Sequence, residues 1–300
     1  MKLRYILSFA LVAAFLGLCT LTNVQTATAE ELKPAKILIF TRSQGFEHEP
    51  ARWVDNGTGT GRILAAYFAE NNKNIEIVET QDGRIFDGNL DQFDAFVFYT
   101  SGNLRGGVAA DDVRRQRNAA FYPMSEAGLR NLIAAVRAGK GFVGIHAATD
   151  THSGDLVEDG VDIYTRFVGA RFTSHGRDQN ATLTVVQPTA FPFLKEKGNS
   201  FVFFDEWYGM NQFNTDMHVV LIQETEGMRG NDYNRPPYPM TWIRAEGEGR
   251  VAYTSVGHNN RYMTGIVGLI GDLVEWSIGR FDADTTPNIE TVTPGFRQMP

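Results

Sequence analysis

The chain has 300 residues, of which 43% are hydrophobic, with 28 basic and 35 acidic side chains and a formal net charge of −7 at pH 7. This balance argues against nucleic acid as a partner, because the one basic run, residues 114–117, lies beside Asp111 and Asp112. The only cysteine, Cys19, lies near the amino terminus, which excludes a disulfide framework, a thiolate metal site and a cysteine nucleophile from the rest of the chain.

The first 29 residues have the pattern of a secretory signal peptide. Lys2 and Arg4 precede an apolar run over residues 6–21, and Ala27-Thr28-Ala29 forms an A-x-A cleavage site. We therefore expect cleavage after Ala29 and a periplasmic or secreted protein. An uncleaved amino-terminal anchor is the alternative. No later segment is long and apolar enough to span a bilayer.

From residue 30 to residue 280, short apolar runs alternate with helical patterns, and we predict one large α/β domain over this range. In the first half, strands are expected at 37–40, 75–78, 95–99 and 141–145, and helices at 59–71 and 126–138. Ser125 is a good cap for the second helix, and Gly139 is a good stop. Strands that alternate with helices predict β-α-β units and a parallel sheet.

Between these units, residues 105–123 are charged and lack clear periodicity, which indicates a surface insertion or a lid. The second half begins with a short helix that ends at Gly169 and a loop over 172–176. Strands are expected at 181–186, 201–204 and 219–222. A hairpin follows, with strands at 238–242 and 250–254 and its turn at 245–249, and the last element is a helix at 266–278. From residue 281 to residue 300 we expect an extended carboxyl-terminal tail.

The most informative stretch runs from Gly139 to Asp150, where a buried strand leads into a turn of small residues that carries His146. In open α/β sheets, ligands bind beyond the carboxyl ends of the strands, so we expect His146 in a functional site. Small neighbouring residues let the backbone turn sharply and let a ligand approach. The alternative is a histidine that is hydrogen-bonded at a strand end and has no chemical role.

Three more histidines, His48, His175 and His258, also fall in loops after predicted strands, and Asp205 and Glu206 follow another strand. A cluster of histidines and carboxylates suits general acid–base catalysis, because imidazole titrates near neutral pH and a carboxylate orients it. Zinc would also accept such donors. However, no two histidines have a spacing such as HExxH, so no metal ligands are predicted and a divalent metal stays an open alternative.

The remaining polar and aromatic candidates are less distinctive. Arg42 and Glu47 lie in the polar loop after the first strand, where a solvated loop is the alternative. Trp207 and Tyr208 suit stacking on sugar rings, although both could equally be core aromatics. Because adjacent strand residues point to opposite faces, Asp205 and Glu206 do not suit the paired carboxylates of a glycosidase. The other two histidines, His152 and His218, are interpreted as structural.

These stretches together resemble the ThuA-like (trehalose utilisation) family of the class I glutamine amidotransferase-like superfamily. The matching segments, in family order, are Gln44-Gly45-Phe46-Glu47-His48, Gly141-Phe142-Val143-Gly144-Ile145-His146-Ala147-Ala148, Phe172-Thr173-Ser174-His175, Asp205-Glu206-Trp207-Tyr208, Pro239-Met240-Thr241-Trp242 and residues 249–258. The resemblance implies a flavodoxin-like, doubly wound, mostly parallel sheet with helices on both faces and a site at its carboxyl edge. True amidotransferases carry a cysteine at the turn where this chain has His146, so glutaminase chemistry is excluded.

The resemblance links the chain to disaccharide catabolism, so the expected partner is a small carbohydrate of trehalose or keto-sugar type. On this hypothesis His146, His258 and Glu206 are catalytic, and the substrate-binding residues are His48, Glu47, His175, Asp205, Trp207 and Tyr208. No cofactor is predicted. Two alternatives stay open: a sugar-binding module without catalysis, and a metal-dependent hydrolase that uses the same histidines and glutamate. The sequence does not indicate an oligomeric state.

Overall fold

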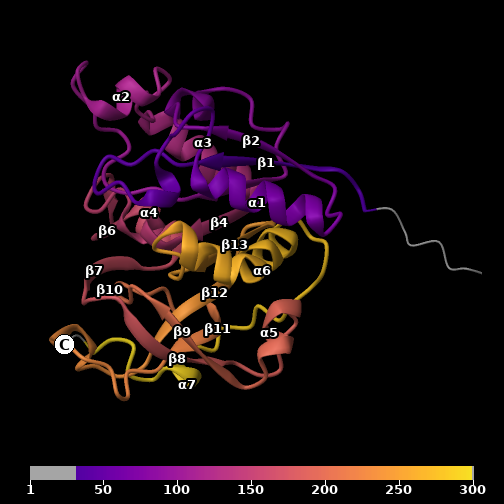
Figure 1. The fold of residues 1–300 in the computed structure, drawn as a ribbon, viewed down its shortest axis with the longest axis vertical. Helices are drawn as coiled ribbons and strands as arrows, with labels where there is room; N and C mark the ends of the chain where they lie inside the picture. Colours follow the sequence, from indigo (N-terminus) through magenta and orange to yellow (C-terminus); the bar gives the residue numbers. More distant parts are fainter. Residues whose placement is uncertain (1–31, 299–300) are drawn as a thin grey trace, which may run out of the picture. The chain divides into compact units, whose positions relative to one another are not determined.

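The structure is a computed structural model that describes residues 32–298, and it is built around one nine-stranded sheet (Figure 1). The expected signal peptide, residues 1–29, lies outside the described residues. In spatial order the strands are β2 (Ile75–Thr80), β1 (Ala35–Phe40), β3 (Ala95–Phe98), β4 (Gly141–Ile145), β13 (Gly249–Thr254), β12 (Tyr238–Glu246), β11 (His218–Gln223), β8 (Gln179–Val185) and β9 (Ser200–Asp205).

The sheet has two halves that differ in strand direction. From β2 to β13 neighbouring strands are parallel, and their central members are buried on both faces, as continuous apolar runs such as Ile37-Leu38-Ile39-Phe40 require. From β13 to β9 every pairing is antiparallel, beginning with the predicted hairpin of β12 and β13. The chain builds this antiparallel half after β4 and then returns to place β13 directly beside β4.

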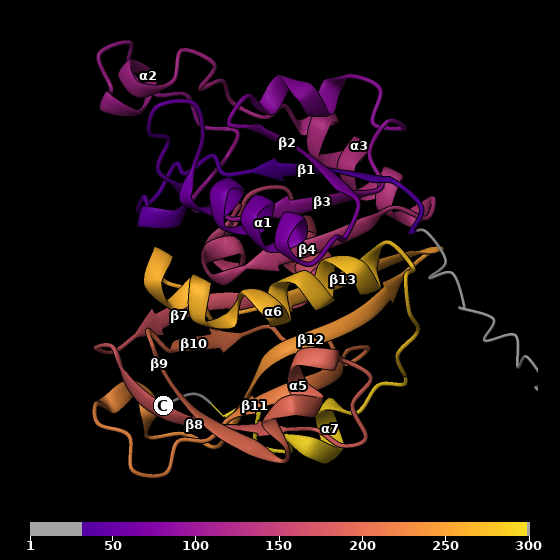
Figure 2. The same ribbon diagram turned by 45° about the vertical axis from the view of Figure 1, so that its right-hand side comes forward.

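Helices cover both faces of the parallel half, as Figures 1 and 2 show. On one face α1 (Gly59–Glu70) packs against α6 (Asn260–Ser277), and on the other lie α3 (Glu126–Arg137) and α4 (Ile163–Val168). Consecutive residues of β4 point to the two layers. A side chain at Gly141 would collide with Ser277 of α6, whereas the Phe142 ring packs 4.7 Å from the Phe167 ring of α4. The predicted α/β fold is therefore confirmed.

Local signals explain where several helices begin and end. Thr58 caps α1 and Ser125 caps α3, each by accepting a hydrogen bond from a backbone N–H in the first turn. Gly169 ends α4 in the left-handed conformation, with φ of 109°. Helix α6 starts six residues before its predicted start, because the Asn259 side chain caps it at Tyr262 N and a polar first turn precedes the apolar face.

The structure differs from the sequence prediction at residues 172–176. Instead of a loop, β7 (Arg171–His175) pairs with β10 (Tyr208–Asn211) in a separate antiparallel ribbon. The sequence gives no alternating apolar pattern here, because neither face of β7 is fully buried and polar residues such as Thr173 and Ser174 are tolerated. A second small ribbon joins β5 (Val157–Glu158) to β6 (Val161–Asp162), and α5 (Pro192–Lys197) packs on α6.

The last residues also differ from expectation. The stretch after residue 280 is not an extended tail up to residue 298, since α7 (Ile289–Val292) packs on β11. Ile289 and Phe296 are buried, and the Asn288 amide bonds to both backbone groups of Val219. Burial of these two apolar side chains holds the segment against the sheet. Among residues 32–298, no helix combines the length and the apolar character needed to cross a bilayer.

Candidate functional site

His146 lies at the carboxyl end of β4, where the chain turns sharply. Its φ of 46° is in the left-handed region, and its ring is fully buried. Nδ1 lies 2.6 Å from the Ser255 carbonyl oxygen, which can only accept a hydrogen bond. Nδ1 therefore carries the proton in the neutral ring, and Nε2 presents a lone pair to the site.

Side chains of two tyrosines contact His146 and hold this turn in place. The Tyr253 hydroxyl, on the neighbouring strand β13, donates to the His146 carbonyl at 2.7 Å and lies 2.9 Å from the Thr149 hydroxyl. The Tyr208 ring packs against the imidazole with centroids 4.2 Å apart. Burial raises the pKa of Tyr208 well above its ordinary value, so this hydroxyl stays neutral.

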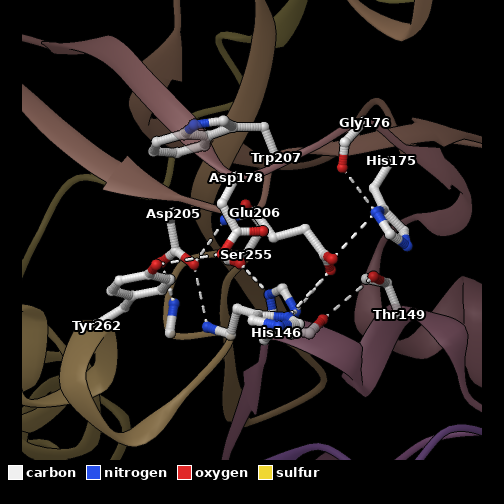
Figure 3. A network of polar contacts seen from close by, with 12 residues as sticks. His146, Thr149, His175, Gly176, Asp178, Asp205, Glu206, Trp207, Ser255 and Tyr262 are labelled. Atoms are coloured by element: carbon white, nitrogen blue, oxygen red, sulfur yellow. Dashed lines mark hydrogen bonds and ion pairs between the residues drawn. The ribbon is translucent and has the colours of Figure 1, made fainter.

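Glu206 connects three histidines, and Figure 3 shows its carboxylate between His146 and His175. One oxygen, Oε2, lies 3.4 Å from His146 Nε2 and 3.1 Å from His258 Nδ1, and Oε1 lies 3.0 Å from His175 Nδ1. Burial alone would raise the pKa of Glu206. The hydrogen bonds and positive charges that His146 and His258 offer in their protonated forms outweigh burial and hold the pKa of Glu206 far below its usual range. Glu206 is therefore ionised.

His258 follows β13 and is fixed from behind by Asp205. The Asp205 carboxylate accepts the backbone N–H of Gly257 at 2.6 Å and that of His258 at 3.1 Å, and burial raises the pKa of Asp205. Burial would lower the pKa of His258, but the hydrogen bond with Glu206 outweighs this and raises it above the ordinary value. Asp205, predicted to bind substrate, is fully buried and holds the loop that carries His258.

His48 comes from the loop after β1 and completes the group. Its ring is 5% exposed and lies edge-on to the rings of His146 and His258, with centroids 4.9 and 5.1 Å away. Burial, followed by the neighbouring histidines, lowers the pKa of His48 to about 2, so the ring is neutral. One donor atom from each of His48, His146, Glu206 and His258 lies within 4.8 Å of every other.

The other predicted site residues have different surroundings. Trp207 is fully buried, and its indole N–H donates to the Gln179 carbonyl at 2.7 Å, which leaves no face open for a sugar. Glu47 forms an ion pair with Arg117 and lies 3.5 Å from Arg52. The structure thus brings together His48, His146, His258, His175 and Glu206, while Asp205 and Tyr208 support them from behind.

Residues 105–123, the predicted insertion or lid, contact the loop after β1. Arg114 of α2 (Val113–Arg117) donates to the Ser43 carbonyl at 2.8 Å, and buried Arg42 donates to the Gly106 carbonyl at 2.8 Å. Together with the Glu47–Arg117 ion pair, these contacts fasten the segment beside the loop that carries His48. Its closure over the site stays a prediction.

Sequence reasoning missed two residues near the site. Phe46 is 68% exposed, and its ring lies 4.8 Å from the His48 ring, so it offers an open aromatic face beside the cluster. An apolar aromatic within a polar loop was the available signal. Tyr253, which holds the His146 carbonyl, gave no signal because it lies in an ordinary apolar strand.

The other two histidines, interpreted as structural, do not belong to the cluster. His218 Nδ1 bonds to the Thr286 carbonyl at 2.7 Å, and buried His152 lies 3.4 Å from Asp155.

Comparison with known proteins identifies the family. The family model described as trehalose utilisation (ThuA) matches residues 36–265. The chain belongs to the ThuA family. The match includes the loop of His48, the turn of His146, and Glu206 and His258, so all four lie within the family's own domain.

Solved structures of ThuA-like proteins share this ThuA-family fold. A ThuA-like protein from Bacteroides uniformis is 18% identical, with a TM-score of 0.60, over 84% of this chain and 94% of its own. One from Parabacteroides merdae is 16% identical, with a TM-score of 0.58, over 84% of this chain and 92% of its own. A search of curated proteins gave no match. The fold is consistent with the glutamine amidotransferase-like superfamily.

Proposed function

We propose that this ThuA-family protein is an exported enzyme that transfers protons on a small carbohydrate of trehalose or keto-sugar type. The observation that carries the proposal is the Glu206 carboxylate, which lies 3.0 to 3.4 Å from the nitrogens of three histidines beyond the carboxyl ends of the sheet. Such a group can take up and return a proton without a nucleophilic thiol. The family's trehalose utilisation supports the substrate class.

The geometry suggests a role for each side chain. His146 Nε2, with its lone pair directed by the Ser255 contact, accepts a proton from the sugar, and Glu206 stabilises the imidazolium that forms. His258, 22% exposed, and His175, 45% exposed, lie on the solvent side, where a sugar enters and where a leaving oxygen needs a proton. The site therefore suits proton abstraction beside a keto group or at a sugar hydroxyl.

The test of the catalytic role uses a substitution that respects the backbone. Asparagine is preferred to alanine at position 146, because asparagine adopts the left-handed conformation of this residue more readily than alanine does. We therefore choose His146→Asn, with His218→Asn as the matched control, since His218 lies on β11 outside the cluster. Full-length protein is incubated with trehalose and with its keto form, and products are detected by NMR.

Loss of turnover in His146→Asn, with the circular dichroism spectrum and the His218→Asn activity unchanged, would support the proposal. Undiminished turnover in His146→Asn would refute the role of His146. If neither sugar is turned over but one raises the melting temperature, the protein is a sugar-binding module instead. Export is tested by amino-terminal sequencing of protein from the periplasmic fraction, where a first residue of Glu30 is expected.

A further inference from the structure

We propose that His48, His146, Glu206 and His258 bind one divalent transition-metal ion. Three imidazole nitrogens and one carboxylate oxygen come from four separate segments of the chain and lie within 4.8 Å of one another. Three of these residues are buried, and the fourth, His258, is partly exposed. The arrangement therefore is an enclosed donor set with one side toward solvent.

The spacing of three of the four donors matches what such an ion needs, and the donor of His48 lies within 4.8 Å of each of them. A metal with ligand bonds of about 2.0–2.1 Å in tetrahedral arrangement places its donors about 3.3 Å apart. The observed separations are 3.3 Å between His146 Nε2 and His258 Nδ1, 3.4 Å between His146 Nε2 and Glu206 Oε2, and 3.1 Å between His258 Nδ1 and Glu206 Oε2. These three atoms form a triangle of the size that one face of a coordination shell occupies.

Contacts outside the cluster orient the donors. The Ser255 carbonyl accepts the Nδ1 proton of His146, which leaves Nε2 unprotonated, and a backbone carbonyl commonly does this for metal-bound histidines. Asp205 fixes the backbone of His258, and His175 holds the second oxygen of Glu206 at 3.0 Å. The donors of His146, His258 and Glu206 are therefore held at the cluster before any ion arrives.

His48 provides an independent observation. More than nine-tenths of this residue is buried, and among residues 32–298 its Nδ1 has no hydrogen-bond partner. A buried polar atom without a partner costs free energy that folding must offset. Other buried atoms among residues 32–298 share this state, both nitrogens of His152 included, but of these residues only His48 belongs to the group of possible metal ligands. Coordination of an ion by this histidine would explain why the chain buries a third imidazole here with no hydrogen bond at its Nδ1.

The donor chemistry narrows the class of ion. Three imidazoles and one carboxylate suit first-row metals from manganese to zinc, whereas calcium and magnesium prefer oxygen donors. For ions of this series that accept a fifth ligand, the exposed side near His258 leaves a position for a sugar oxygen. Binding of the ion does not depend on the proposed function, but its use to polarise a sugar oxygen rests on it. With the ion bound, His146 Nε2 acts as a ligand and not as the base.

The binding test uses untagged full-length protein that has been stripped with EDTA and dialysed. ZnCl₂ is titrated by calorimetry, and CoCl₂ by the visible absorption of bound cobalt. We expect saturation at about one ion per chain, with affinity at least about 10-fold weaker in His258→Gln and in Glu206→Gln, and unchanged in His218→Gln. His258→Gln is included because this side chain is partly exposed and its loss least disturbs folding.

Absence of saturable binding would overturn the inference, as would equal affinity in wild type, His258→Gln and Glu206→Gln. Turnover assays separate this inference from the proposed function. If the stripped protein turns over sugar and does not bind zinc, the metal site is overturned and the proposed acid–base enzyme is supported. Zinc binding at the cluster without turnover of either sugar would support the metal site and count against the proposed function.

Discussion

The hydroxyl of Tyr253 offers a quantitative test of how the turn at His146 is held. This fully buried hydroxyl donates to the His146 carbonyl at 2.7 Å, and the Thr149 hydroxyl lies 2.9 Å from it. Tyr253→Phe keeps the ring and removes only the oxygen. The substitution leaves the His146 carbonyl without its shortest hydrogen bond, at a residue whose left-handed φ of 46° is already unfavourable.

The expected cost follows from these contacts. A buried polar group that loses its partner costs about 1–3 kcal/mol, and the Thr149 hydroxyl, 3.5 Å from the His146 carbonyl, recovers part of it only if it moves closer. We therefore expect Tyr253→Phe to lower the free energy of unfolding by about 1–3 kcal/mol. The assay is urea unfolding at pH 7, in which the midpoint shifts while the slope stays constant.

The matched control is Tyr262→Phe. Its hydroxyl makes a 3.2 Å hydrogen bond to Asp178 in a partly exposed position, so water can replace the lost contact and the expected change is below about 0.5 kcal/mol. If Tyr253→Phe changed stability no more than Tyr262→Phe, the hydrogen bond to the His146 carbonyl would not be what holds the turn.

Three further predictions concern other parts of the molecule. Burial raises the pKa of Asp272 to about 6, so the folded state loses stability as the pH rises from about 4 to 6. Asp272→Asn should therefore have a higher melting temperature than wild type above pH 6. A difference in melting temperature that does not change with pH would contradict this. Phe46→Ala should raise KM for the sugar several-fold with little change in melting temperature, because it removes the exposed ring beside His48. Phe204→Ala, which removes another exposed phenylalanine ring, should leave KM unchanged. Equal effects of the two substitutions on KM would argue against a sugar platform at Phe46. Phe142→Ala should lower the free energy of unfolding by about 3–5 kcal/mol in urea, since its ring is fully buried between the sheet and α4, and a loss below about 1 kcal/mol would show that the core closes around the gap.

Much of the parallel half could be predicted because its signals are local. The apolar runs of β1, β3 and β4 are continuous, and the cap at Ser125 marks the start of α3. The position of His146 then followed from topology alone, since ligands gather at the carboxyl ends of parallel strands. The antiparallel hairpin of β12 and β13 was equally visible, as two apolar runs around a glycine-containing turn.

What could not be predicted depends on contacts between distant segments. The neighbouring residues in the sequence do not decide whether Trp207 is a sugar platform or a core residue. The structure shows that it is fully buried, with its indole N–H bonded to the Gln179 carbonyl. Asp205 and Glu206 are adjacent, yet one faces backbone N–H groups and the other faces histidines. No local pattern distinguishes these roles, because both depend on which loop lies opposite.

The insertion of the whole antiparallel half between β4 and β13 has a consequence for the order of folding. His146 and Ser255 meet across 109 residues of sequence, and His175 and Glu206 belong to the inserted part. Closing so long a loop costs chain entropy that only the completed sheet offsets, so contacts of this kind form late. The complete cluster, with Glu206 and His175, is therefore absent from any intermediate in which only β1 to β4 have formed. A ligand that needs the complete cluster binds only the fully folded protein. The time at which ligand binding appears during refolding would therefore report when the last folding step occurs.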